Sequence, residues 1–238
     1  ALAEKYERAV KAPLPTPFAD IAAQAKPLKT FAEKIETVGR GLQKQITYSG
    51  DWRTTKGEYF PAGHSSVVKQ GRGDCKDYAN SMAAILRNLG FTSYVALTFR
   101  RSPYHQQKAL QEMAATANFG YFNHAIVWAK DPSGKVWWID PTNPVVIAEV
   151  LSNDLLGNFA LVLDGVSSST QMLPTKNSEP SKLTLSQTFR LKPDNSVEVE
   201  GTLSANAVAN NSLSMIEKFA GAEAMKKTFA ALINRANV

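Results

Sequence analysis

The single cysteine of this chain lies in the run GRGDCKDYANSMAAILRNLG, at the start of a clearly marked helix. Asp74 is a suitable N-cap residue, and Asp77 can complete a capping box. Cys75 would then be the first helical residue, where free backbone N–H groups and the helix dipole stabilise a thiolate, the nucleophilic form of cysteine. Asp74 adds a negative charge that opposes this effect, while Arg72 and Lys76 offset it. The alternative is an inert cysteine that packs in the core.

A nucleophilic thiol needs a base, and the base needs a group that orients it. The chain has three histidines. His124 lies in the strand-like run YFNHAIVW, whereas His64 and His105 lie in loop-like sequence. His124 is therefore the candidate base, and its alternative is a histidine that is simply satisfied within the core.

A predicted hairpin brings a carboxylate to this histidine. The sequence DPSGK at residues 131–135 suits a three-residue loop. Closing that loop places Trp128 opposite Trp138, so His124 becomes a diagonal neighbour of Asp140 on the same face of the sheet. Asp140 could then hold the orientation of the imidazole. The alternative for Asp140 is a turn-forming residue before the proline that follows it.

Composition limits the other classes of function. With 238 residues, 44% of them hydrophobic and 20% charged, the chain resembles an ordinary globular protein. One cysteine and three scattered histidines offer no disulfide framework and no ligand spacing, so neither a metal nor another cofactor is expected. The net charge of +6 suits an anionic partner, but the basic residues form no block or nucleic-acid motif. We therefore expect no nucleic-acid partner, and no apolar run is long enough for a membrane span.

The elements that must position these residues follow from the apolar pattern. Residues 1–46 are predicted to be helical, with a short segment before a proline-rich run and a longer helix after it. The apolar residues of the longer helix recur at intervals of three and four: Leu28, Phe31, Ile35, Val38, Leu42 and Ile46. Gly39 and Gly41 weaken its second half. The helix that begins at Cys75 extends to Leu89.

Between and after these helices the pattern changes to strands and loops. Strands are predicted at about 92–99, 121–129 and 135–140. Residues 47–72 look irregular because of their glycines and prolines. The polar stretch at 100–118 is predicted to be a long loop with a short helix near 108–115.

The C-terminal part has a different composition. Residues 166–181 are rich in Ser, Thr, Asn and Pro, which predicts a linker. Beyond it, LTLSQTFRL and SVEVEGTL alternate like the strands of a hairpin, and a helix is predicted over about 212–234. Two strands and a helix are too little to stand alone, so this tail would be the start of a larger flanking domain.

Three segments, GDCKDYANSMAAILRNLGF, FNHAIVW and WWIDPTNP, resemble the active-site segments of the transglutaminase-like superfamily. Members of that family are papain-like proteins with a cysteine at a helix start and a His–Asp pair on adjacent strands. The resemblance covers roughly residues 45 to 165. It looks most like a bacterial branch in which this core sits in a longer secreted or periplasmic protein. A periplasmic or secreted location is therefore expected, with the cytoplasm as the alternative.

The resemblance implies an α+β fold, with N-terminal helices packed on an antiparallel sheet and a small β-rich C-terminal segment. Residues 1–45 would form the N-terminal helical segment of the core, and residues 46–165 the transglutaminase-like core itself. Residues 166–181 would be the linker, and residues 182–238 a hairpin followed by a helix.

The resemblance also assigns roles to the chemical residues. Cys75 would be the nucleophile, His124 the base and Asp140 the orienting residue of a Cys-His-Asp triad. The backbone N–H of Cys75 and one upstream donor would hold the oxyanion. The candidates for the upstream donor and for contacts with the substrate are Trp52, Tyr59, Asp74 and Asn123.

The chemistry so implied is acyl transfer on an amide or peptide bond through a thioester, with a protein or peptide as substrate. An anionic cell-envelope polymer is a second candidate partner. Hydrolysis is expected rather than amine cross-linking, since water is always present and an amine needs a second organised site. The alternative is a non-catalytic module that grips a peptide or glycan in the same cleft. The aromatic residues available for such a cleft are Trp52, Tyr104, Tyr121, Trp128, Trp137 and Trp138.

Overall fold

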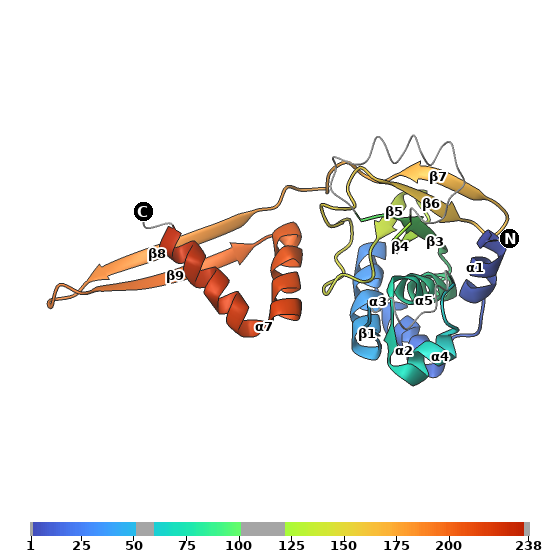
Figure 1. Ribbon diagram of the computed structural model, residues 1–238, viewed down its shortest axis with the longest axis horizontal. Coiled ribbons are helices and arrows are strands. Elements are labelled where there is room, and N and C mark those ends of the chain that lie inside the picture. The colour runs from blue at the N-terminus through green and yellow to red at the C-terminus, as the bar shows by residue number, and fades with distance from the viewer. Residues whose placement is uncertain (1, 51–59, 101–121, 236–238) are drawn as a thin grey trace. The chain divides into compact units, whose positions relative to one another are not determined.

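A computed structural model describes residues 2–50, 60–100 and 122–235 of the chain. They form two compact units, Ala1–Ser178 and Glu179–Val238 (Figure 1). The helices of the first unit are α1 (Leu2–Val10), α2 (Thr16–Ala25), α3 (Phe31–Gln45), α4 (His64–Gln70) and α5 (Cys75–Asn88). Its short strands β1 (Thr47–Tyr48) and β2 (Arg72–Gly73) pair in parallel.

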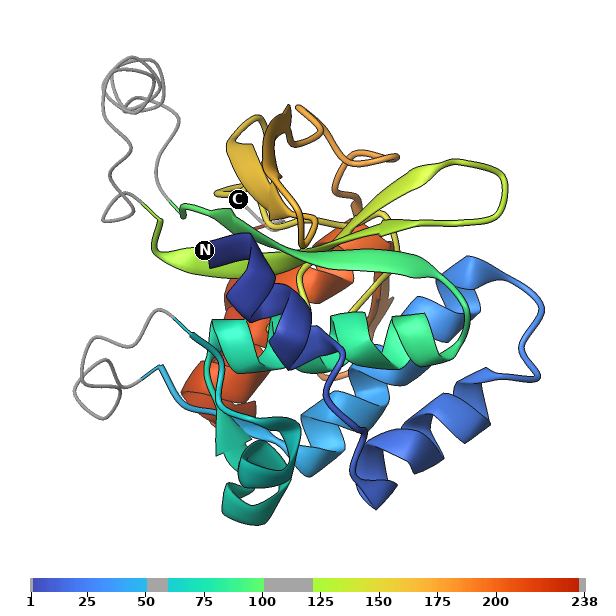
Figure 2. The same ribbon diagram turned by 90° about the vertical axis from the view of Figure 1, so that its right-hand side faces the viewer.

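The main sheet of the first unit is antiparallel and has the strand order β5-β4-β3-β6-β7. Its strands are β3 (Thr92–Thr98), β4 (His124–Lys130), β5 (Val136–Ile139), β6 (Phe159–Leu163) and β7 (Ser168–Met172). Helix α5 packs against β3 and β4 and also against α2 and α3 (Figure 2). The predicted α+β fold, with helices on an antiparallel sheet, is confirmed.

Helix α5 is surrounded by protein along most of its length. Every residue from Asp77 to Leu86 is buried, although the sequence predicted only one apolar face. Small residues such as Ala79, Ala83 and Ala84 let the neighbouring elements approach from several sides. The start of this helix, and with it Cys75, is therefore fixed by the core.

The hairpin of β4 and β5 has the predicted register. Trp128 pairs with Trp138, and the loop closes with a hydrogen bond of 3.1 Å from the Asp131 N–H to the Lys135 carbonyl oxygen. Gly134 adopts a φ of 88°, which a glycine allows at little cost. This register brings the start of β4 beside the residue that follows β5.

Several elements differ from the sequence-based expectation. The proline-rich run does not continue as a loop: Pro15 caps α2 and Pro17 lies in its first turn, where a missing N–H costs nothing. The sequence also gave no indication of α4 or β6. Within the predicted linker, Ser168–Met172 forms the edge strand β7, whose exposed polar side chains hide the alternation of a strand. The short helix predicted near 108–115 lies outside the described residues.

The second unit contains the two predicted strands and the predicted helix. Strands β8 (Leu183–Leu191) and β9 (Val197–Ala205) form an antiparallel hairpin, and α7 (Ala207–Arg235) follows. Helix α7 is kinked at Gly221, where φ is 83°.

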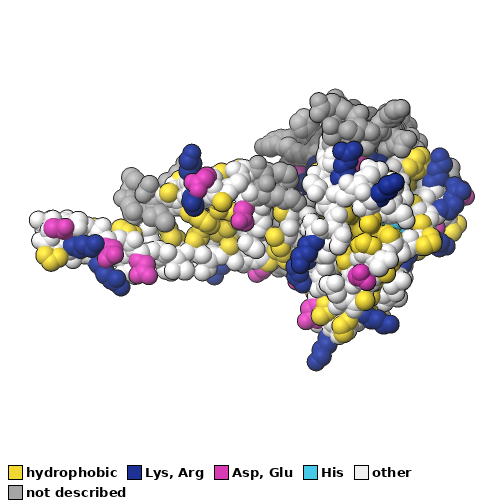
Figure 3. Space-filling model, turned by 90° about the horizontal axis from the view of Figure 1, so that it is seen from below, with side chains coloured by type: hydrophobic (Ala, Val, Ile, Leu, Met, Phe, Trp, Pro, Cys, Tyr) yellow, Lys and Arg dark blue, Asp and Glu magenta, His cyan; other side chains and the backbone are white. Residues whose placement is uncertain are grey.

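The distribution of basic side chains can be seen on one face of the molecule. On the face drawn in Figure 3, Lys and Arg side chains are spread over several positions and form no single patch. None of the helices in the described part of the chain has the length and apolar character needed to cross a membrane.

An ion pair ties the N-terminal helix to α5. Arg87 donates to Glu7 through both guanidinium nitrogens, at 2.8 and 2.7 Å, and through Nε to the Ser93 carbonyl oxygen at 2.7 Å. Its guanidinium also lies 4.8 Å from the ring centre of Tyr94. Both side chains of the pair are largely buried, so this ion pair helps to hold α1 against α5.

Helix α3 braces the loop that follows β5. A Cβ atom at Gly39 would lie 2.4 Å from the Cβ of Val146, so only glycine permits this close approach. One turn later, Gln43 Nε2 donates to the carbonyl oxygens of Pro141 at 2.8 Å and Asn143 at 2.9 Å. The glycine that weakens the helix by propensity therefore lets it hold the loop next to Asp140.

We expect Gly39→Ala to lower the free energy of unfolding by about 1–3 kcal/mol, because Val146 and its loop would have to move. Gly63→Ala is the matched control, since nothing lies within 4 Å of a Cβ at that position. There the loss of a favourable cap residue and the smaller unfolded-state entropy nearly cancel. Urea unfolding measures both variants. Equal effects would contradict a close-packed contact at Gly39.

Candidate active site

Cys75 begins α5, as the sequence predicts. The capping box is present: Asp74 accepts a hydrogen bond from the Lys76 N–H at 3.1 Å, and Asp77 accepts one from the Asp74 N–H at 3.0 Å. Cys75 is partly exposed and packs against the edge of the apolar core. The thiol therefore lies where a substrate can reach it and where the helix favours a negative charge.

Asp77 joins three segments around the nucleophile. Besides the cap, its carboxylate accepts a hydrogen bond of 2.7 Å from the Ala62 N–H, and its side chain lies where a Cβ on Gly73 would collide. Burial and the nearby charge of Asp74 raise the pKa of Asp77, and these hydrogen bonds oppose the rise. Asp77 thus holds the backbone at Ala62 and at Asp74, the residue before Cys75.

The charge of Asp74 is balanced locally. Its carboxylate forms an ion pair with Lys76 Nζ, and the two side chains are only 16% and 13% exposed. Arg72 is exposed, so among the described residues the compensation comes from Lys76. The predicted conflict between Asp74 and a thiolate is therefore small.

His124 and Asp140 form a buried pair. His124 Nε2 lies 3.0 Å from Asp140 Oδ2, with the two side chains 3% and 0% exposed. A proton on Nε2 donates to this carboxylate and leaves Nδ1 for the thiol. Cys75 lies near enough to His124 to contribute to the raised pKa of the imidazole. The structure thus brings together the three residues predicted from the sequence, and their catalytic roles stay predictions.

Charge controls the protonation of this pair. Burial alone lowers the pKa of His124, but the charge and the hydrogen bond of Asp140, together with the nearby Cys75, outweigh it and raise the pKa to about 9. For Asp140, burial raises the pKa, but His124, Arg100 and Thr142 together lower it well below its usual range. An ionised Asp140 beside a protonated His124 is the favoured state at neutral pH.

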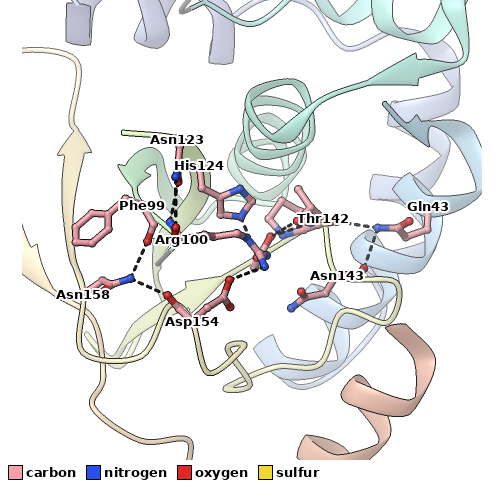
Figure 4. A network of polar contacts seen from close by, with 11 residues as sticks. Gln43, Phe99, Arg100, Asn123, His124, Thr142, Asn143, Asp154 and Asn158 are labelled. Carbon is pink, nitrogen blue, oxygen red and sulfur yellow. Dashed lines mark hydrogen bonds and ion pairs between the residues drawn. The ribbon is translucent and has the colours of Figure 1, made fainter. Parts of the chain in front are cut away.

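Two partners of Asp140 were not predicted. Arg100 Nη2 lies 2.5 Å from Asp140 Oδ2, and the N–H and hydroxyl of Thr142 donate to Oδ1 at 3.0 and 2.7 Å (Figure 4). The sequence Asp-Pro-Thr is a recognisable turn signal for the second contact. Arg100 could have been found only from the pairing of Thr98 with His124, which brings the end of β3 to the histidine.

The other candidates are placed differently. Asn123 Oδ1 accepts a hydrogen bond of 2.7 Å from the Arg100 N–H, and its Nδ2 donates to the Arg100 carbonyl oxygen at 3.3 Å. Asn123 therefore supports the backbone of Arg100. Trp52 and Tyr59 lie outside the described residues. Asp74 caps the helix and pairs with Lys76, as described above.

Tyr48 lies near Cys75 and Asp140, although the sequence predicted an irregular region at this position. It pairs with Gly73 through β1 and β2, and its ring lies 6.0 Å from that of Tyr78. Burial and the electrostatic influence of Cys75 and Asp140 raise its pKa, so the phenol keeps its proton.

The aromatic side chains proposed for a binding cleft belong to the core wherever the structure describes them. Trp128, Trp137 and Trp138 are buried in the two apolar clusters on the sheet. Trp52, Tyr104 and Tyr121 lie outside the described residues. In the part of the chain that the structure describes, no group of three or more His, Cys, Asp or Glu residues could hold a metal ion.

We expect Asp140→Asn to bring the pKa of His124 below its ordinary value of about 6.5. Burial and the charge of Arg100 would then act without opposition from a carboxylate. NMR titration of the histidine rings measures this, and three histidines keep the spectrum simple. Asp194→Asn, on the exposed turn between β8 and β9, is the control and should leave the pKa of His124 unchanged. A midpoint that stays near the native value in Asp140→Asn would contradict the pairing.

The same pair should make stability depend on pH. The folded pKa of His124, about 9, lies above its unfolded value. Its contribution is therefore complete below about pH 6.5 and is lost as the pH rises through the folded pKa. The free energy of unfolding should fall across this window by up to about 1.4 kcal/mol per pH unit in the native chain, but not in Asp140→Asn. Urea unfolding at several pH values tests this, and a flat native profile would count against it.

Comparison with known proteins identifies a family. The model of the Transglutaminase-like superfamily matches residues 19–141, just over half of the 238-residue chain. No curated protein matches. Two solved structures are similar: a "putative protease" from Parabacteroides distasonis (12% identity, TM-score 0.47, 73% of this chain) and a TGase (14%, 0.37, 53%). The chain spans 30% of the length of each. On the family match, the chain belongs to the transglutaminase-like superfamily.

Proposed function

We propose that this chain carries out cysteine-dependent acyl transfer on amide or peptide bonds, and that water is the usual acceptor. The observation that supports this most directly is the joint placement of Cys75, His124 and Asp140. A partly exposed thiol begins a helix and lies near enough to a buried imidazole to contribute to its raised pKa, and a buried carboxylate holds that imidazole at 3.0 Å. Such an arrangement supplies a nucleophile, a proton carrier and an orienting group.

In the first half of the reaction, the Cys75 thiolate attacks the carbonyl carbon and a C–S bond forms. The backbone N–H of Cys75, which has no acceptor within the helix, is suited to stabilise the developing oxyanion. The protonated His124 then gives its proton to the leaving amine as the C–N bond breaks. The products of this half are a thioester on Cys75 and a free amine.

In the second half, neutral His124 takes a proton from water, which attacks the thioester carbonyl. The C–S bond breaks, the carboxylic acid leaves, and the thiolate and imidazolium are restored. Asp140 stays ionised throughout, because its surroundings hold its pKa far below neutrality. It keeps the Nε2 proton on His124 and stabilises the imidazolium.

Hydrolysis is favoured over amine transfer on general grounds. Water reaches any thioester on a partly exposed cysteine, whereas amine transfer needs a second site that orders the amine and excludes water. The substrate in this proposal is a protein or peptide. A periplasmic or secreted location belongs to the same proposal, since it follows from the resemblance to the bacterial branch.

The binding-module alternative has less support. Three of the six aromatic side chains that it would use are buried in the core. A binding module also has no need for a thiol beside a charged His–Asp pair.

We expect iodoacetamide to alkylate native Cys75 at neutral pH at least about tenfold faster than it alkylates His124→Ala or the urea-unfolded chain. The imidazolium should stabilise the attacking thiolate only in the folded native chain. Because there is one cysteine, the whole signal belongs to Cys75. A slow thiol that is indifferent to His124 would remove the basis for catalysis and leave the binding module as the better proposal.

The reaction itself can be followed with casein or a quenched fluorogenic peptide, in the presence and absence of a fluorescent primary amine. Cys75→Ala should lose about 10³-fold in kcat/KM for both hydrolysis and amine incorporation. Activity that survives in Cys75→Ala would overturn the thioester mechanism. Amine incorporation that exceeds hydrolysis would keep the mechanism and overturn the preference for water.

A further inference from the structure

Each oxygen of the Asp140 carboxylate accepts two hydrogen bonds. Among the described residues its carboxylate accepts four hydrogen bonds: Oδ1 takes both from Thr142, and Oδ2 takes one from His124 and one from Arg100 (Figure 4). A carboxylate offers about four lone-pair sites, so this one is saturated. Arg100 and His124 therefore share a single oxygen of the group that orients the histidine.

Arg100 is held in place by its own set of contacts. Its Nη1 lies 3.1 Å from Asp154 Oδ2, and the side chain of Asn123 bonds both its N–H and its carbonyl oxygen. Asn158 Nδ2 donates to the carbonyl oxygens of Phe99, at 2.7 Å, and Asp154, at 2.9 Å. The Arg100 side chain is only 30% exposed and Asp140 is fully buried. Their ion pair therefore differs from fully exposed surface pairs, which contribute little to stability.

The charges around His124 act in opposite directions. Asp140, which follows β5, favours the protonated imidazole, and so does Cys75 from α5. Arg100, beyond the end of β3, places a positive charge on the same carboxylate and disfavours it. Tyr48, from β1, remains a neutral phenol in this environment. Asp154 forms a second ion pair with Arg100 and partly neutralises the charge of the guanidinium.

We propose that Arg100 is a positioning residue which sets how strongly Asp140 holds the protonated His124, because it occupies part of the oxygen that binds the imidazole. The catalytic meaning of this rests on the proposed function. An imidazolium that is held too tightly is a poor acid toward a leaving amine. By weakening the hold of Asp140, Arg100 makes the Nδ1 proton of His124 easier to transfer, while Asp140 itself stays ionised.

NMR titration of His124 tests the proposal without a substrate. Arg100→Gln should move the midpoint of His124 upward by about one pH unit, since the opposing charge and the competing donor are both lost. Arg100→Lys keeps the charge and should shift the midpoint less. Arg190→Gln, which removes an exposed arginine of the hairpin, is the matched control and should cause no shift. A midpoint that stays or falls in Arg100→Gln would overturn the proposal.

A second variant guards against loss of folding. Asp154→Asn leaves the contact between Arg100 and Asp140 in place and removes the second carboxylate that pairs with Arg100. The charge of Arg100 then bears on Asp140 alone, so the midpoint of His124 should move downward. An upward shift or no shift would overturn the proposal even if Arg100→Gln does not fold.

Kinetics separates this inference from the proposed function. Arg100→Gln should lower amide hydrolysis about tenfold relative to hydrolysis of a p-nitrophenyl ester, whose leaving group needs no proton. An unchanged amide-to-ester ratio would overturn the role of Arg100 while thioester chemistry stands. An inert Cys75 together with a shifted His124 would instead overturn the proposed function and keep the contact between Arg100 and Asp140.

Discussion

A carboxylate that is removed from water keeps its charge only where donors replace the water on every side. Asp140 meets this requirement with donors from three parts of the chain: the turn that follows it, the adjacent strand β4, and the segment beyond β3. The candidate site therefore depends on two strand registers at once. A slip of one residue in either register would turn a donor to the opposite face and leave a buried charge without its partner.

The nucleophile is positioned by different means. Helix α5 is enclosed by the sheet and by other helices, and its first turn is fixed by the capping box and by Asp77. The thiol thus belongs to a rigid helix, while the acid–base pair belongs to the sheet. The proximity of Cys75 and His124 follows from how helix α5 packs on strand β4.

The sequence was informative where the relevant interactions are local. The cap of α5 and the three-residue loop at Asp131 each involve residues a few positions apart, so residue types alone predict them. Arg100 escaped prediction because its contacts to Asp140 and Asp154 join residues 40 and 54 positions away. Strand β7 escaped because an exposed edge strand needs no apolar alternation. The domain boundaries proposed from composition stay predictions.

The contacts of Arg87 bear on which stretch of this chain can be treated as a separate module. The family match begins at residue 19, after α1, yet Glu7 on α1 neutralises an arginine of the helix that carries Cys75. A fragment that starts at the family boundary would lose this ion pair and also Tyr6 and Val10 of α1, which are buried in the same core cluster as α5. The packed unit is thus larger than the stretch that the family match covers. Recombination between relatives would have to carry α1 along with the helix of Cys75.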